Sequence, residues 1–142
     1  MEALTVPAGF SEMRPYGPFH KLVGPMYCRK AEGHFFVGLR MEDRHCNGLG
    51  IGHGGVLLTL ADTAMTFAVS GSVPRGSRTV TTTLSSDLIG AARSGDWIEA
   101  EAQVLRAGKR IVFLDCRIHR DGAQGSLLLR ASATFAVSPP AA

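Results

Sequence analysis

The sequence has few cysteines, no long uninterrupted apolar run and no large excess of charge of one sign. Its three cysteines are odd in number and scattered, with no CxxC pair, which argues against a disulfide framework or a zinc site. The longest apolar stretch, residues 56–69, is too short to span a bilayer and contains Asp62. The N-terminus lacks the basic and apolar character of a secretory signal. We therefore expect a soluble, cytoplasmic protein without a membrane segment.

Composition narrows the class further. The chain has 142 residues, of which 45% are hydrophobic and 19% charged, and this suits a single globular domain over residues 1–142. A net charge of +3 favours anionic ligands but is too small to indicate nucleic-acid binding. The histidines show no metal-ligand spacing, so we expect no metal and no cofactor. Residues 1–30 have the glycine and proline content of an N-terminal arm, and residues 138–142 that of a flexible tail.

Five segments have the patterns of β-strands, and one has the pattern of a long helix. Alternating or β-branched residues predict strands over residues 34–41, 79–84, 97–105, 111–119 and 126–137. The stretch that follows Gly55 is apolar almost all round, so a helix there must be buried on nearly every side. We therefore predict an α+β fold in which an antiparallel sheet of about five or six strands curls around one central helix.

A glycine-rich segment leads into this helix and is the most informative part of the chain. Residues 47–55 read NGLGIGHGG, which leaves backbone N–H groups unshielded where the helix begins. The first N–H groups of a helix lack internal partners and carry partial positive charge. Such a helix start suits an oxyanion or an anionic ligand. Alternatively, Gly54 and Gly55 simply allow the helix to pack closely on the sheet.

Asp62 is the one acidic residue of the predicted helix. An acid among apolar neighbours is expensive to bury, so its presence indicates a site. A structural role, with the carboxylate bonded to Thr59 or Thr66, is the alternative. Gly55 and Asp62 are seven positions apart, which is about 10 Å along a helix axis. One small carbonyl does not reach both, whereas two antiparallel helices across a two-fold axis bring Gly55 of one chain near Asp62 of the other.

These residues carry a family resemblance. The block formed by Asn47, Gly50, His53, Gly54 and Gly55 with the acid at position 62, the 79–84 strand, and the 106–109 turn before a strand resemble hotdog-fold acyl-CoA thioesterases. The nearest branch resembles the PaaI-type, 4-hydroxybenzoyl-CoA thioesterase-like group, over about residues 20–137. The resemblance implies the hotdog fold, hydrolysis of an acyl- or aryl-CoA thioester, homodimers with composite active sites, and a dimer of dimers.

The resemblance also implies roles for individual residues. Asp62 is the expected general base or nucleophile, and the Gly55 backbone N–H polarises the thioester carbonyl. Asn47 orients water or assists at the carbonyl, although it could equally be a turn residue. His53 supports the site. Thr81 is expected to help position the water, whereas a register shift of one residue would put Thr82 there instead.

Substrate contacts are expected in two places. Gly54, Leu58 and Met65 are expected to line the site near the acyl group. Cations around a glycine turn could hold the phosphates of coenzyme A, although such charges are as often plain solvated surface. The residues of this turn are Arg106, Gly108, Lys109 and Arg110.

Two other functions are compatible with the same scaffold. A non-catalytic acyl-CoA-binding or sensing protein would bind without releasing thiol, and the intact set of Asn47, Gly55 and Asp62 argues against it. A hotdog dehydratase or hydratase usually pairs an acid with a histidine base in a strand-loop-helix segment, whereas this chain has its lone acid later in the helix. The acyl group itself is not readable from the sequence.

Overall fold

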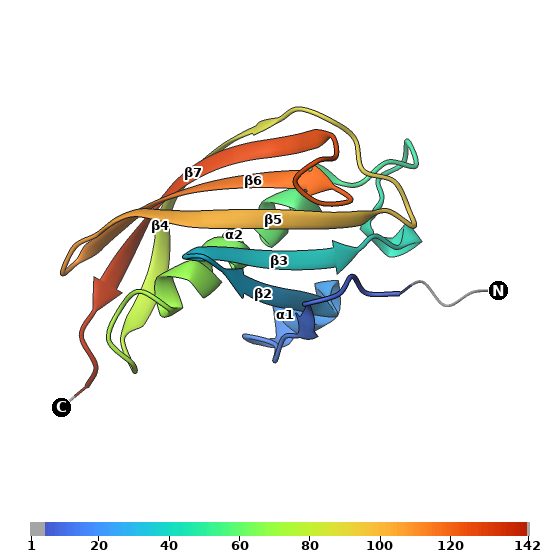
Figure 1. Ribbon diagram of the computed structural model, residues 1–142. Helices are drawn as coiled ribbons and strands as arrows, with labels where there is room; N and C mark the ends of the chain where they lie inside the picture. The colour runs from blue at the N-terminus through green and yellow to red at the C-terminus, as the bar shows by residue number, and fades with distance from the viewer. Residues whose placement is uncertain (1–4, 142) are drawn as a thin grey trace.

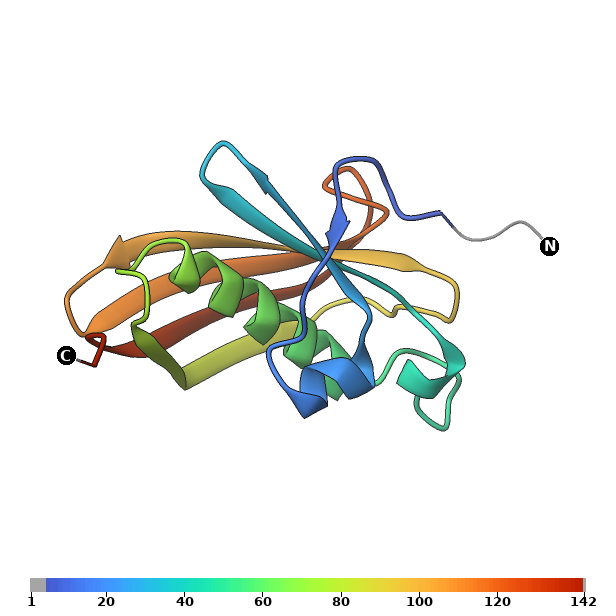
Figure 2. The ribbon, with the colours of Figure 1, turned by 90° about the horizontal axis from the view of Figure 1, so that it is seen from below.

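An antiparallel sheet of seven strands wraps around one long helix in the computed structural model, which describes residues 5–141 (Figures 1 and 2). The long helix is α2 (Gly54–Ser70), and a short helix, α1 (Pro18–Val23), and a 3-10 turn, η1 (Asp43–His45), lie near its N-terminal end. The strand order across the sheet is β1-β2-β3-β5-β6-β7-β4. The strands are β1 (Ser11–Glu12), β2 (Met26–Ala31), β3 (His34–Arg40), β4 (Arg78–Leu88), β5 (Trp97–Ala107), β6 (Ile111–Arg120) and β7 (Leu127–Ser138).

The core lies between α2 and the concave face of the sheet. Alternate side chains of β6, at positions 112, 114, 116 and 118, are buried, whereas those between them face outward. The α2 side chains Leu57, Leu60, Ala64 and Met65 meet this face and are almost completely buried. Hydrophobic burial on this scale is the main force that keeps the helix inside the curved sheet. This arrangement is the expected hotdog fold.

Four of the five predicted strands end later than predicted, the one over residues 34–41 ends one residue earlier, and two strands, β1 and β2, are added. Strand β2 covers residues 26–31 and pairs with β3 through a tight turn at Glu32 and Gly33, both with positive φ. Strand β1 and residues 26–30 of β2 fall within the segment expected to be an arm, so parts of that segment belong to the sheet. Strand β4 runs four residues beyond the predicted end, and β7 includes Ser138 of the expected tail. Residues 1–4 and 142 lie outside the described residues.

The two edges of the sheet differ in length. Strand β1 has only two residues, whereas β4 has eleven and pairs with β7 alone. Exposed apolar side chains lie at both ends of β4: Val80 is 64% exposed, and Leu88 and the following Ile89 are about half exposed. A long edge strand with apolar side chains is a ready template for pairing with another chain.

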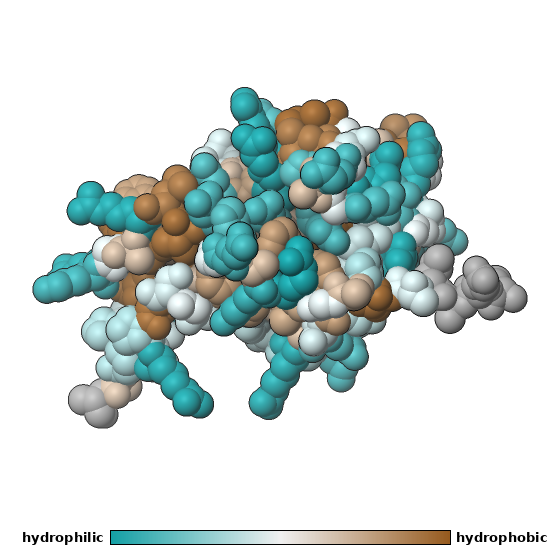
Figure 3. Space-filling view, in the orientation of Figure 1, coloured by the Kyte–Doolittle hydropathy of each residue, from teal (hydrophilic) through white to brown (hydrophobic). Residues whose placement is uncertain are grey.

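The convex face of the sheet is mostly hydrophilic. Figure 3 shows this face, with a hydrophobic area towards the end where β5 and β6 are joined. The exposed apolar side chains of that hairpin are Leu105, Ile111 and Phe113. Within residues 5–141, no helix is both long enough and apolar enough to cross a bilayer.

Candidate active site

Asp62 lies near the middle of α2 and faces the edge strand β4. The hydroxyl of Thr81 donates a hydrogen bond of 2.6 Å to Oδ1 of Asp62. This is the only hydrogen bond to the Asp62 carboxylate from residues 5–141, so Oδ2 is left for another partner. Thr59 and Thr66, which the sequence offered as structural partners, instead direct their hydroxyls to the backbone carbonyls of Gly55 and Asp62. The carboxylate is therefore not held as an internal helix cap.

A register irregularity in β4 decides which threonine faces the acid. In the pairing of β4 with β7, Thr81 lies opposite Phe135 and Thr83 opposite Thr134, so Thr82 is the extra residue of a bulge. The hydroxyl of Thr82 donates to the carbonyl of Thr134 and is exposed. The sequence favoured Thr81 over its neighbour, and the structure places Thr81 against the carboxylate.

The half-buried Asp62 lines a cavity of about 310 Å³ between α2 and the segment that contains α1. The hydroxyls of Thr59, Thr63 and Thr66 each donate a hydrogen bond to a backbone carbonyl one turn earlier in the helix. Their O–H donors are therefore not available to a ligand. Aromatic and apolar groups form the opposite wall. The lining residues are Tyr16, Gly17, Pro18, Phe19, His20, Thr59, Asp62, Thr63 and Thr66.

Helix α2 begins at Gly54, with His53 as its N-cap. The backbone N–H of Gly55 donates to Nδ1 of His53 over 2.9 Å, which satisfies one of the free donors of the first turn. Since Nδ1 accepts, a neutral His53 carries its ring proton on Nε2, and this side chain is exposed. His53 therefore caps the start of α2, and its supporting role in the site stays a prediction. In this arrangement the Gly55 N–H is already engaged, so a substrate carbonyl must share it or displace the ring.

The glycines are not needed for close packing on the sheet. A Cβ added to Gly54 would meet only the end of Leu88, at 3.4 Å, which is an ordinary contact. A Cβ on Gly55 would meet the ring of His53 at 3.0 Å, so the crowding comes from the cap and not from a neighbouring strand. Both glycines leave the helix start open, and the first turn of α2 contains no acidic residue.

Asn47 organises the loop before the helix. Its Oδ1 accepts from the N–H of Leu49 at 2.9 Å and from the N–H of Ile51 at 3.4 Å, so the side chain forms a turn of the kind that asparagine favours. Gly50, with a φ of 75°, completes this turn. The side-chain oxygen is therefore committed to the loop, which leaves the amide NH₂ as the group that can donate to a ligand.

Side-chain hydrogen bonds from the exposed Arg44 and the buried His45 hold α1 beside this loop. The Arg44 guanidinium donates to the carbonyls of Leu22, Val23 and Gly24 at the end of α1. Nδ1 of the buried His45 accepts from the Glu42 N–H, so its Nε2–H donates to the carbonyl of Val23 at 2.7 Å. The carbonyl of His45 in turn accepts the N–H of His53 at 2.8 Å. The cavity wall and the helix start are thus joined through η1.

The remaining predicted substrate residues lie away from this cavity. Met65 is fully buried in the core, and the half-buried Leu58 packs against that core; neither lines the cavity beside Asp62. Leu58 and Met65 are four and three positions from Asp62 and so share its side of the helix, but both pack against the core. The sequence did not single out Tyr16, Phe19 or His20, because their proximity to α2 is a tertiary contact.

The cationic turn lies at the hairpin of β5 and β6. All four of its residues are exposed: Arg106, Gly108, Lys109 and Arg110. The last three also line a mainly apolar groove of about 550 Å³ together with Val73, Pro74 and other residues after α2 and β7. The groove is separate from the cavity at Asp62 in the single chain.

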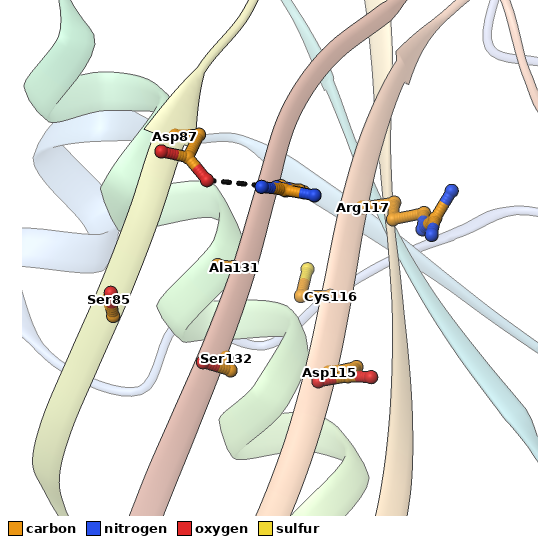
Figure 4. Close-up of a pocket in the computed structure, with 8 residues that line it drawn as sticks. Ser85, Asp87, Asp115, Cys116, Arg117, Ala131 and Ser132 are labelled. Carbon is orange, nitrogen blue, oxygen red and sulfur yellow. Dashed lines mark hydrogen bonds and ion pairs between the residues drawn. The ribbon is translucent and has the colours of Figure 1, made fainter.

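A further hollow, of about 350 Å³, lies on the convex face of the sheet (Figure 4). Asp87 on β4 accepts a hydrogen bond of 2.8 Å from Arg130 on β7, and Asp115 and Arg117 of β6 stand nearby on the same face. Because α2 lies on the other side of the sheet (Figure 4), these charges do not contact Asp62. Within residues 5–141, no group of three or more histidine, cysteine, aspartate or glutamate side chains is placed to hold a metal ion.

Comparison with known proteins agrees with this fold. A family model described as the thioesterase superfamily matches residues 49–126, which include most of the glycine-rich segment, α2 and strands β4 to β6. A Pseudomonas aeruginosa protein, PA0474, named only provisionally as an esterase, is 38% identical over 117 residues, 82% of this chain and 87% of that protein.

Two further relatives are informative. Human acyl-coenzyme A thioesterase 13 is 31% identical over 83 residues, which are 58% of this chain and 59% of that protein. The structure of the Escherichia coli PaaI protein, from the phenylacetic acid degradation operon, superimposes with a TM-score of 0.69 at 27% identity, over 77% of this chain and 75% of that one.

Proposed function

The chain belongs to the thioesterase superfamily, and on that premise we propose that it hydrolyses the thioester of an acyl- or aryl-coenzyme A to the free acid and coenzyme A. The observation that carries this proposal is the Asp62 carboxylate, whose Oδ1 is fixed by Thr81 and whose Oδ2 has no partner among residues 5–141. The carboxylate lines a cavity large enough for a small acyl group. The reaction needs water and side chains only, without a metal or cofactor.

Two chemical routes use the same carboxylate. As a general base, Asp62 takes a proton from water while the water oxygen attacks the thioester carbon. The C–S bond then breaks, and the sulfur leaves as a thiol after it gains a proton. As a nucleophile, the carboxylate attacks the thioester carbon first, the C–S bond breaks to release the thiolate, and water hydrolyses the mixed anhydride that remains. In both routes Thr81 keeps the carboxylate in place and negative charge develops on the carbonyl oxygen.

The donors for that oxygen come from a helix start, and a single chain does not bring them to Asp62. Gly55 and Asp62 lie on one continuous helix, about 10 Å apart along its axis. We propose that the open edge of β4 pairs with β4 of a second copy around a two-fold axis. The two α2 helices then run antiparallel, so that the first turn of one faces Asp62 of the other.

In this composite site the Gly55 N–H and the Asn47 amide of one copy polarise the carbonyl held against Asp62 of the other. His53 shares the Gly55 N–H in the free chain and releases it when the carbonyl arrives. Lys109 and Arg110 are proposed to bind the phosphates of coenzyme A at the mouth of the groove beside them. Two such dimers are proposed to form a tetramer.

Co-expression of two inactive variants tests the composite site. Asp62→Asn removes the base, and Gly55→Val covers the helix start. A mixed dimer of these two chains has one site with both defects and one intact site. Random pairing therefore restores about a quarter of the wild-type activity if each site takes one part from each chain. Activity no higher than that of the separate variants would rule the shared site out.

A panel of short, medium, long and aryl acyl-CoA thioesters tests the activity itself. Thiol release from any of them should be strongly reduced by Asp62→Asn, with unchanged folding by circular dichroism. Saturable binding of every member without thiol release would instead identify a binding or sensing protein.

A further inference from the structure

His20 is a buried histidine in the wall of the cavity that contains Asp62. It lies in α1, only 7% of the residue is exposed, and it borders the same space as Asp62 and Thr63. No role is predicted for it from the sequence, because it is neither spaced for a metal nor part of the glycine-rich segment. A buried ring with two polar nitrogens nevertheless requires partners for both.

The protonation state of this ring follows from its contacts. The backbone N–H of Tyr16 donates to Nδ1 of His20 at 3.2 Å, so Nδ1 must carry a lone pair. The neutral ring then has its proton on Nε2. Burial lowers the pKa of His20 from its ordinary value, and this favours the neutral form near pH 7.

The Nε2–H donor is left without an acceptor. Nε2 is shielded from solvent and has no hydrogen-bond partner within residues 5–141. An unsatisfied buried donor costs about 1–3 kcal/mol, so a fold that retains one indicates an acceptor that arrives from outside the chain. The ring is not displaced easily towards a new partner, since Arg44 and His45 fix the end of α1.

The cavity suits the acyl part of a thioester rather than the nucleotide part. None of its lining residues is a lysine or arginine, whereas the phosphates of coenzyme A need cations. The Tyr16 ring packs edge-on against His20, Phe19 lines the same cavity, and the two residues are 52% and 62% exposed. An entering group therefore reaches the ring by displacing surface side chains and not the core. The acyl chain bound next to Asp62 is therefore the part of the substrate that meets His20.

We propose that His20 is a specificity-determining residue whose Nε2–H donates a hydrogen bond to an oxygen carried by the acyl group. This inference rests on the proposed thioesterase function and names the substrate class of that site: hydroxyacyl or oxoacyl thioesters, in preference to plain hydrocarbon chains. A site built to hydrogen-bond an oxygen rejects the analogue that lacks it, because the buried donor is then left unpaired.

The test compares hexanoyl-CoA with hexanoyl-CoA hydroxylated at each carbon in turn, from the third to the terminal carbon. For at least one position the wild-type protein should have a kcat/KM about tenfold above that for hexanoyl-CoA. His20→Phe keeps a ring without a donor and should abolish this ratio, whereas His20→Gln keeps an N–H at similar reach and should retain most of it. Lys21→Gln, an exposed change on the same helix, should leave the ratio as in the wild type.

Several results would overturn the proposal. These are a ratio no greater than one at every position in the wild type, a ratio that survives in His20→Phe, and an equal loss of the ratio in His20→Phe and His20→Gln. A parallel measurement separates this proposal from the proposed hydrolysis. Calorimetric binding to the Asp62→Asn variant should show the same preference for the hydroxylated thioester, and adding His20→Phe should remove it. If this binding preference is present but the wild-type protein hydrolyses none of the thioesters, the role of His20 is retained and the proposed hydrolase activity is rejected.

Discussion

The Thr81 hydroxyl on the edge strand donates a 2.6 Å hydrogen bond to the Asp62 carboxylate on the central helix, although the two residues are 19 positions apart. The contact links β4, the edge strand proposed to pair with a second chain, to the carboxylate proposed to act in catalysis. A change at the edge of the sheet therefore reaches the site through one side chain. A bulge at Thr82 gives Thr81 this direction.

Thr81→Val should lower kcat/KM by about tenfold, because it removes a hydrogen bond to a charged group and frees the carboxylate to rotate. The measurement is steady-state thiol release. Thr82→Val on the same strand is the matched control, since the Thr82 hydroxyl bonds the carbonyl of Thr134 instead. Equal losses in the two variants would show that the strand, and not the bond to Asp62, matters.

Replacement of Lys109 and Arg110 together by glutamine should raise KM by about tenfold and leave kcat nearly unchanged, because these cations are proposed to bind phosphates far from the reacting carbon. The difference in KM between the variant and the wild type should shrink as salt is added to both assays, since salt screens exposed charges. Arg93→Gln, which removes an exposed cation outside the groove, is the control. An unaltered KM would remove the turn from the substrate site.

Val80→Lys should weaken the proposed dimer, because it puts a strongly hydrated charge on the exposed edge strand. Sedimentation should show smaller species at micromolar concentration, and the specific activity should fall with them. Leu105→Lys makes the same change on the convex face and should preserve the dimer. A fully active monomer of either variant, or of the wild type, contradicts the shared site.

Cys116 should be inert towards thiol reagents at pH 8 in the native protein. Burial, with the nearby carboxylates of Glu101 and Asp115, raises its pKa to about 12, so almost none of it is thiolate. Because the folded pKa lies above the ordinary value of 9.0, the thiol favours the folded state below that pH, and this contribution declines as pH rises from about 9 towards 12.

Labelling with a coloured disulfide reagent checks this. The half-buried Cys46 should react in the native protein, and Cys116 only after denaturation. In alkaline unfolding experiments, Cys116→Ala should flatten the loss of stability above pH 9 relative to the wild type. Rapid native labelling of Cys116 would show that it is not shielded as the structure indicates.

Local patterns in the sequence predicted the central helix, the meander of β5 to β7 and the pair of Asp62 with a glycine-rich helix start. These features depend on neighbours in the chain: alternation every second residue, apolar residues all round a helix, and glycine next to a helix N-terminus. Strand β2 escaped prediction because glycine and proline before it suggested irregular structure. Met65 and Leu58 were expected near the acyl group, whereas in the single chain they pack against the core, because spacing along a helix does not show which side the sheet covers.

Sequence patterns alone predict the kind of fold and single out Asp62 as the proposed acid, because a lone carboxylate within an apolar helix is informative wherever the rest of the chain lies. That Thr81 and not Thr82 meets this acid, and that His20 lies across the cavity, became visible only in the folded chain. These placements depend on a bulge and on the docking of α1, and such geometry arises only when distant segments pack together.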